Sequence, residues 1–86
     1  YDEAETLYLQ ALDMYKKLLG DEHPNVATFL NNLALLYDNQ GRYDEAETLF
    51  LQALEMNKKL LGDEHPHTQI AQRSYQTLLE KKKKLP

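Results

Sequence analysis

The sequence has no cysteine and no tryptophan, and it has only three glycines and three prolines among its 86 residues. Without cysteine, the chain forms no disulfide and offers no thiolate as a nucleophile or zinc ligand. No apolar run approaches the roughly 20 residues that a membrane-spanning helix needs. β-Branched residues are scarce, whereas Leu, Ala, Glu, Lys and Gln are abundant. This composition favours helices over strands and predicts an all-α fold.

A basic surface is also lacking, because acidic residues outnumber basic ones, the net charge is −4 and the pI is about 5.2. General nucleic-acid binders carry a basic patch, so no nucleic-acid partner is expected. No targeting segment opens the chain, and we expect a cytoplasmic protein with no membrane partner. The first residue is Tyr1 rather than methionine, so the natural protein is expected to begin upstream.

The chain repeats itself with an offset of 42 residues. Residues 1–24 and 43–66 differ at only three of 24 positions. The differing pairs are Tyr8/Phe50, Asp13/Glu55 and Tyr15/Asn57. The following segments, 25–42 and 67–84, share one identity in 18, Leu36 with Leu78. A period of this length is typical of repeat arrays whose units stack on one another.

Four helices are predicted from apolar residues that recur every three or four positions. The predicted helices span residues 2–19, 24–40, 44–61 and 66–84. Asp2 and Asp44 are the predicted N-caps, each followed by acidic residues in the positively polarised first turn. Pro24 suits the first position of a helix because its missing N–H would have no partner there. Gly20 and Gly41 are predicted to end the preceding helices.

The stretch LNNLALLYDNQGRYDEAETLFLQALEM, residues 30–56, resembles the tetratricopeptide repeat. The matching positions are large apolar residues, alanines and a turn glycine: Leu30, Leu33, Ala34, Tyr37, Gly41, Tyr43, Ala46, Phe50 and Ala53. In this family they pack helix A of a repeat on helix B. The ordinary repeat has 34 residues. The eight extra residues here, within KKLLGDEHP, are similar to the long repeats of kinesin light chains and related bacterial arrays.

The resemblance implies a right-handed α-α superhelix of antiparallel helix pairs, in which the A helices line a concave groove that binds peptides or proteins. The helix order in this chain is then B-A-B-A. Within one domain of 1–86, residues 1–20 are helix B of an incomplete repeat and residues 24–61 are a complete A–B repeat. Residues 66–84 are a C-terminal capping helix.

The two ends of this array are predicted to differ. The first helix lacks helix A of its own repeat, so its apolar face is expected to be open and to allow self-association. This face comprises Ala4, Leu7, Tyr8, Ala11 and Tyr15. At the other end, glutamines replace apolar residues of the preceding helix A. The pairs are Ala27/Gln69, Leu30/Gln72 and Ala34/Gln76, which predicts a face that meets water, as a terminal repeat requires.

A polar stripe remains on the predicted A helices once core positions are assigned. On the helix over 24–40 it comprises Thr28, Asn31, Asn32, Leu35, Asp38 and Asn39, and on the last helix Arg73 and Thr77 are comparable. Amides can hold an extended peptide because they both donate and accept hydrogen bonds. In the resembled family, an asparagine at the position of Asn32 often does so. The alternative is a plain solvated stripe, but the apolar Leu35 favours a ligand-binding groove.

Other residues suggest more specific sites but have simpler interpretations. The basic carboxylate clamp of some members of the resembled family is not expected, because only Arg73 is basic among the comparable early positions. His23, His65 and His67 suggest a zinc site, but a histidine before a helix-initiating proline is expected to cap that helix. The lysines at 81–84 could attract phosphate or an anionic membrane, but are expected to complement the helix dipole.

The sequence favours a protein–protein interaction scaffold over an enzyme. It has no glycine-rich phosphate loop and no HExxH motif. Its carboxylates cluster at predicted helix starts, where the helix dipole explains them. No catalytic residue, metal or cofactor is therefore expected. A structural module that self-assembles through exposed repeat faces is the alternative, and an artificial consensus-type sequence without a natural ligand is a third.

Overall fold

The computed structural model describes residues 2–20 and 23–85, except for the side chains of Asp2 and Ala4. These residues form four α-helices: α1 (Asp2–Leu19), α2 (Pro24–Asn39), α3 (Tyr43–Leu61) and α4 (Pro66–Lys83). No strand occurs in this described part of the chain. The predicted all-α class is confirmed, and every predicted helix boundary lies within one residue of the observed one.

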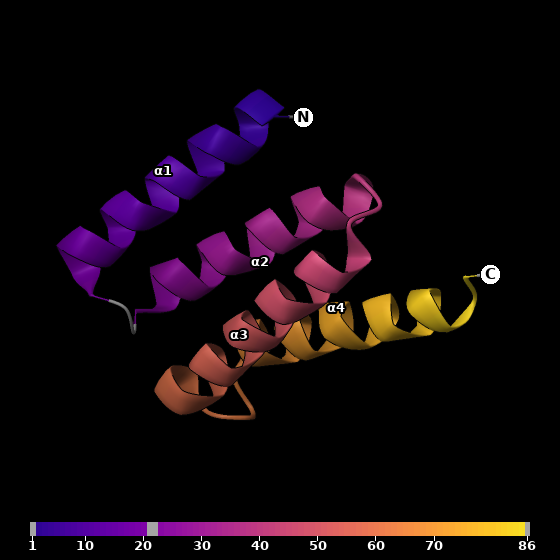
Figure 1. Ribbon diagram of the computed structural model, residues 1–86. Helices are drawn as coiled ribbons and strands as arrows, with labels where there is room; N and C mark the ends of the chain where they lie inside the picture. Colours follow the sequence, from indigo (N-terminus) through magenta and orange to yellow (C-terminus); the bar gives the residue numbers. More distant parts are fainter. Residues whose placement is uncertain (1, 21–22, 86) are drawn as a thin grey trace.

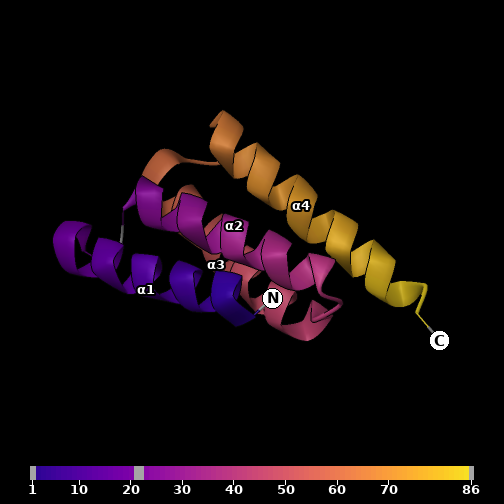
Figure 2. The same cartoon turned by 90° about the horizontal axis from the view of Figure 1, so that it is seen from above.

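The helices follow one another across a flat molecule whose Cα atoms extend over 41 × 34 × 15 Å. Each helix packs on its neighbours in sequence, α1 on α2, α2 on α3 and α3 on α4. Helices α1 and α4 therefore lie at opposite ends of the stack (Figure 1), and in the view from above they lie on opposite sides of α2 (Figure 2). Nearest-neighbour packing of this kind is the architecture of a helical repeat array.

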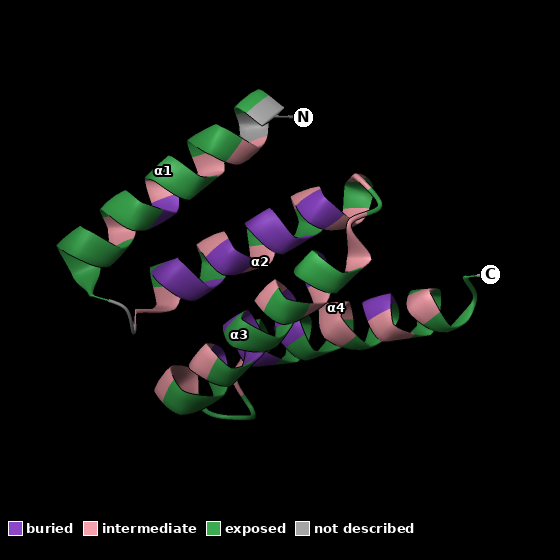
Figure 3. Ribbon diagram, in the orientation of Figure 1, coloured by how far each residue is buried: buried purple, intermediate pink, exposed green. Residues whose placement is uncertain are grey.

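Helix α2 is buried on two sides because apolar residues occur around much of its circumference. Its buried residues are Val26, Ala27, Leu30, Leu33, Ala34 and Tyr37. Figure 3 shows buried positions along α2, whereas α1 is mostly exposed. On α3, Ala46 and Ala53 are 0% exposed and Phe50 is 1% exposed. Because the alanines are small, the backbones of α2 and α3 can approach closely around the Phe50 ring.

Aromatic rings make the contact between α1 and α2. Tyr8 meets Phe29 edge-on with ring centroids 6.1 Å apart, and Tyr15 lies 4.6 Å from the same ring. Such edge-on and tilted contacts are favoured by the charge distribution of aromatic rings. At the equivalent place between α3 and α4, 42 residues later, the chain has Asn57 and Ala71 instead.

Histidines cap both of the helices that begin with proline. The backbone N–H groups of Asn25 and His67 donate to the Nδ1 atoms of His23 and His65, each over 3.1 Å. The prolines that follow the two caps occupy the first helical turn, where no N–H is needed. The capping role expected for His23 and His65 is therefore confirmed.

The turn between α2 and α3 depends on Gly41, whose φ of 78° lies in the left-handed region that favours glycine. The N–H groups of Gly41 and Arg42 donate to the carbonyl oxygens of Asp38 and Tyr37 over 3.0 and 2.9 Å. This pair of bonds is a Schellman motif, which satisfies carbonyls that the end of α2 leaves open.

The predicted N-cap at Asp44 is wrong. Helix α3 begins one residue earlier, at Tyr43, and it is preceded by Arg42, which makes no side-chain cap hydrogen bond. The backbone explains the shift, because the N–H of Ala46 already donates to the carbonyl of Arg42 over 3.0 Å. The same prediction for Asp2 falls on a side chain outside the described part of the structure.

Helix α4 turns one apolar side toward α3 and a polar side to solvent. Ala71 and Leu78 are buried, whereas Ile70 is 52% exposed. Ala71 rather than Ile70 therefore belongs to the packed side. The three glutamines at 69, 72 and 76 are exposed, as their placement on a water-facing side predicted.

Glu5 links α1 to the end of α2. Its carboxylate accepts a hydrogen bond from the Tyr37 hydroxyl over 2.8 Å and pairs with Arg42 over 2.6 Å. The Arg42 guanidinium also pairs with Glu45 and lies 4.2 Å from the centre of the Tyr37 ring. The hydrogen bonds from Arg42 and Tyr37 lower the pKa of Glu5, while burial and the bond to Glu5 raise the pKa of Tyr37.

Two lysines of the C-terminal run tie α4 to other helices. The Lys82 ammonium lies 2.7 Å from carboxylates of both Asp44 and Glu47 on α3. The Lys81 ammonium lies 2.9 Å from Asp38 near the end of α2. Hydrogen bonds to these carboxylates raise the pKa of both lysines. A role in complementing the helix dipole is therefore an incomplete account of this lysine run.

The contacts of Glu5 predict that the stability of the protein falls in acid. Because the folded-state pKa of Glu5 is below its ordinary value of 4.5, its contribution is fully present above that value. The contribution is lost as the pH falls through the folded-state pKa. Glu5→Gln should lower the urea midpoint near pH 7 and shrink the difference between pH 7 and about pH 3. The substitution should matter less in an Arg42→Gln background, and an unchanged pH dependence in Glu5→Gln would contradict this role.

The buried hydroxyl of Thr68 predicts a stabilising substitution. Thr68 and Val26, which occupies the equivalent position 42 residues earlier, are both 0% exposed. The Thr68 Oγ1 has no hydrogen-bond partner among the described residues. An unpaired buried hydroxyl costs about 1–3 kcal/mol, so Thr68→Val should raise the free energy of unfolding by roughly 1 kcal/mol or more. Val26→Thr is the matched control and should lower it by a similar amount. Urea unfolding followed by circular dichroism measures both, and a less stable Thr68→Val protein would show that the hydroxyl is satisfied.

Candidate functional site

Helices α2 and α4 are not neighbours in sequence, yet they share one face of the molecule. Near their C-terminal ends they are joined by the ion pair of Asp38 and Lys81. Near their N-terminal ends, residues of both helices line a single hollow. We call this surface the α2–α4 face and define it by Thr28, Asn31, Asn32, Leu35, Asp38, Asn39, Arg73 and Thr77.

The part of the α2–α4 face on α2 is polar with one apolar residue in its middle. Asn32 and Asn39 are exposed, and Leu35 between them is 42% exposed. The Thr28 hydroxyl donates to the carbonyl of Pro24 over 3.2 Å, which leaves its lone pairs available. A ligand lying along α2 would therefore meet amide groups on both sides of an apolar contact.

Two of the predicted groove residues already have roles inside the molecule. Asp38 is half-buried and is paired with Lys81, so its carboxylate helps to hold α2 and α4 together. Asn31 is half-buried and lines the hollow. On α4, Arg73 and Thr77 are exposed.

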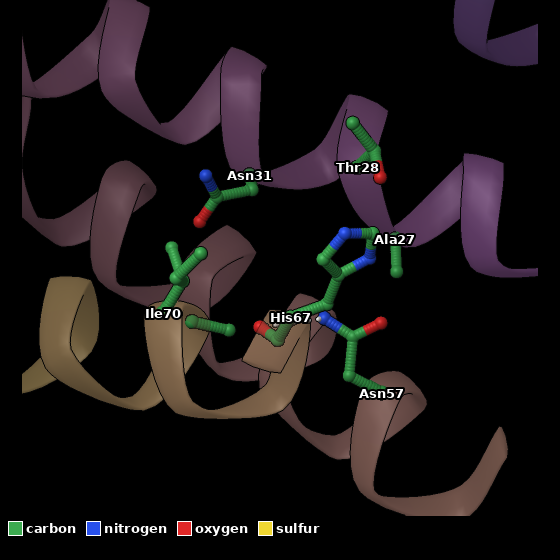
Figure 4. Close-up of a pocket in the computed structure, with 7 residues that line it drawn as sticks. Ala27, Thr28, Asn31, Asn57, His67 and Ile70 are labelled. Atoms are coloured by element: carbon green, nitrogen blue, oxygen red, sulfur yellow. Dashed lines mark hydrogen bonds between the residues drawn. The ribbon is translucent and has the colours of Figure 1, made fainter. Parts of the chain in front are cut away.

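The hollow has a volume of about 200 Å³. We call it the α2–α4 hollow; its lining residues are Ala27, Thr28, Asn31, Asn57, His67, Ile70 and Ala71. Figure 4 shows side chains of α2 facing those of α4, with the ring of His67 reaching toward Thr28. The lining combines apolar groups with amides, a hydroxyl and an imidazole, and it includes no Asp, Glu, Lys or Arg.

One polar atom of this lining is unsatisfied. The Oδ1 of Asn31 is buried and has no hydrogen-bond partner among the described residues. On the opposite side, the Nδ2 of Asn57 donates to the carbonyl of His67 over 3.5 Å, which is a long and weak contact. Buried polar groups are nearly always hydrogen-bonded, so this oxygen is a local departure from complete hydrogen bonding.

The sequence analysis missed several residues of the hollow. The sequence analysis placed none of Ala27, Asn57, His67 and Ala71 in the predicted groove. A signal was present nonetheless. The pair Tyr15/Asn57 is one of three differences between the repeated segments, and Phe29 aligns with Ala71 at the same offset of 42 residues.

The residues proposed for self-association lie on α1 with different degrees of exposure. Leu7 is 65% exposed, whereas Tyr8, Ala11 and Tyr15 are half-buried. Tyr8 and Tyr15 contact Phe29, so α2 already covers part of this face. Ala4 also belongs to the proposed face, but its side chain is outside the described part of the structure.

Metal binding and membrane insertion find no support in the described residues. Among them, no group of three or more His, Cys, Asp and Glu side chains is placed to hold a metal ion. His65 and His67 lie with ring centroids 5.0 Å apart, and the backbone N–H of His67 donates to His65. No described helix is both long and apolar enough to pass through a bilayer.

A comparison with protein families identifies the repeat. The model of the tetratricopeptide repeat matches the chain twice, over residues 1–59 and residues 30–79. The two matches overlap in α2 and α3, and together they reach from α1 into α4. A comparison with curated proteins found no match.

Proposed function

Because the chain belongs to the tetratricopeptide repeat family, we propose that it binds a protein or peptide along the α2–α4 face. Repeats of this family generally mediate protein–protein interaction or assembly and act as non-catalytic scaffolds. The proposal rests chiefly on Leu35, which is 42% exposed in the middle of an otherwise polar face. An apolar contact surrounded by amides suits a peptide, since the amides can bond its backbone while the apolar group receives a side chain.

A peptide library provides the test. We expect the 86-residue chain to select peptides from a phage-displayed random library, and Leu35→Glu and Asn32→Ala to weaken a selected peptide at least about tenfold, or 1.4 kcal/mol. The reason is that each substitution removes a contact on the α2–α4 face and leaves the core intact. Isothermal titration calorimetry measures the affinity, and circular dichroism checks that helicity is kept.

Glu55→Ala on α3 is the matched control, because Glu55 is exposed and lies outside the α2–α4 face. It should leave the affinity unchanged. Equal affinities for the wild type, Leu35→Glu and Asn32→Ala would mean that peptides bind elsewhere.

Assembly through α1 is a second candidate function, favoured by a comparison of the two repeat copies. Leu7, Met14 and Leu18 of α1 are 65%, 63% and 78% exposed. Their repeat mates on α3, at positions 49, 56 and 60, are half-buried. A nearly identical helix is therefore covered in one place and open in the other. The polar α4 end does not complement this surface, so a two-fold contact between copies of α1 is the expected arrangement.

Sedimentation equilibrium over a range of concentrations tests this assembly. We expect the wild type to self-associate and Leu7→Glu to shift it toward the monomer, because the charge would be buried between two copies of α1. Leu7 is preferable to Tyr8 for this purpose, since Tyr8 also packs on Phe29. Ile70→Glu at the opposite end serves as the control and should not change the association. A wild type that is monomeric throughout would exclude the two-fold contact.

A further inference from the structure

The open apolar residues of α1 form a single line along the helix. Leu7, Ala11, Met14 and Leu18 are separated by four, three and four residues. Side chains at this spacing lie on one side of an α-helix and form the contact seam of a coiled coil. Leu7, Met14 and Leu18 are exposed and Ala11 is half-buried, so the described part of the chain leaves this line open. We call these four residues the α1 seam.

A row of polar and charged residues follows one edge of the α1 seam. Glu3, Gln10 and Lys17 recur every seven residues, and all three are exposed. The row therefore carries a negative charge near the start of α1 and a positive charge near its end. The Lys17 ammonium lies 3.2 Å from the Asp13 carboxylate. Both side chains of that pair are well exposed, so the contact is weak and leaves Lys17 able to bind a second carboxylate.

The opposite edge of the α1 seam is occupied by α2. Tyr8 and Tyr15, also seven residues apart, contact the ring of Phe29 there. In a parallel pair of α1 helices, the charged row of one copy would face these tyrosines of the other copy. In an antiparallel pair, the charged rows of the two copies face each other. The direction of pairing therefore decides whether the charges of the row find partners.

An antiparallel pair is complementary in both shape and charge. When Leu7 of one copy lies opposite Ala11 of the other, a large side chain meets a small one, and Glu3 lies beside Lys17 of the second copy. One two-fold axis serves both contacts, because the midpoints of the two pairs are positions 9 and 10. A two-fold interface makes each contact twice. The helix dipoles also oppose each other, whereas a parallel pair would align them and set Ala11 against Ala11.

We propose that α1 of one copy pairs in an antiparallel arrangement with α1 of a second copy, and that ion pairs between Glu3 and Lys17 of the opposite copy select this register. The inference rests on the assembly through α1 proposed above, and it assigns the residues that make that assembly specific. The α1 seam supplies the attraction between copies. The charged pairs at its edge fix the direction and the partner, because they make other pairings repulsive.

Charge reversal tests this pairing. In Glu3→Lys the flanking pairs become Lys with Lys, and in Lys17→Glu they become Glu with Glu. Each variant alone should self-associate roughly tenfold more weakly than the wild type, since both attractive pairs of the dimer become repulsive. An equimolar mixture of the two variants should associate about as well as the wild type, because opposite charges then face each other at both ends. Sedimentation equilibrium measures all three samples.

Glu55→Lys is the matched control, because it makes the same change of charge at an exposed position of the nearly identical helix α3, outside the α1 seam and its edges. It should leave the association unchanged. The differences between the variants should also shrink in about 1 M NaCl, where the Debye length falls to about 3 Å. Circular dichroism checks that each variant folds. Should Lys17→Glu lose helicity, Glu3→Lys alone decides, because undiminished association of that variant contradicts the pairing.

The inference is overturned if the mixture associates no better than the separate variants, or if Glu3→Lys associates as strongly as the wild type. If Leu7→Glu still weakens the association in either case, assembly through α1 stands and only the antiparallel register fails. A wild type that is monomeric at every concentration rejects the assembly itself. Weak association of each variant alone, restored in the mixture, supports both.

Discussion

Helix α2 has apolar residues on two sides, and it is not stable in water unless both are covered. α1 covers one side with the rings of Tyr8 and Tyr15, and α3 covers the other around Phe50. Once α3 is fixed in this way, its second side must be covered by α4. The only side of α2 left to solvent is the polar one, and it lies beside α4. The position of the α2–α4 face therefore follows from the burial of its opposite sides.

Ion pairs also stabilise this order of helices. The contact between α1 and α2 and the contact between α3 and α4 form them with different residues. Glu5 and Glu47 lie 42 residues apart at equivalent positions of the repeat, and each pairs with a cation near the end of the following helix. The partner is Arg42 in one case and Lys82 in the other, which are not repeat mates. The stack therefore accommodates either an arginine or a lysine at this place, provided that each carboxylate has a basic partner. Equivalent ion pairs therefore form even though segments 25–42 and 67–84 share one identity in 18.

The fold was largely predictable because its signals are local. Apolar periodicity, prolines at helix starts and Gly41 at a turn each act within a few residues, and they placed all four helices. The error at Asp44 arose because an acidic residue in a first turn has the same composition signal as an N-cap. The hollow instead combines residues of α2, α3 and α4, which no local pattern in the sequence brings together. The similarity to kinesin light chains stays a prediction.

The hollow is also a place where the chain gives up stability that its own sequence shows to be attainable. Asn57 is 6% exposed with only a 3.5 Å contact to a carbonyl, and Asn31 buries an unpaired oxygen nearby. Between α1 and α2, the equivalent positions hold the packed rings of Tyr15 and Phe29. Local departures from good packing and full hydrogen bonding are expected at functional sites, where a ligand completes what the protein leaves open. The nearly exact repetition of residues 1–24 in 43–66 sharpens this reasoning, because it makes the loss of the ring at Asn57 a change in an otherwise unchanged helix.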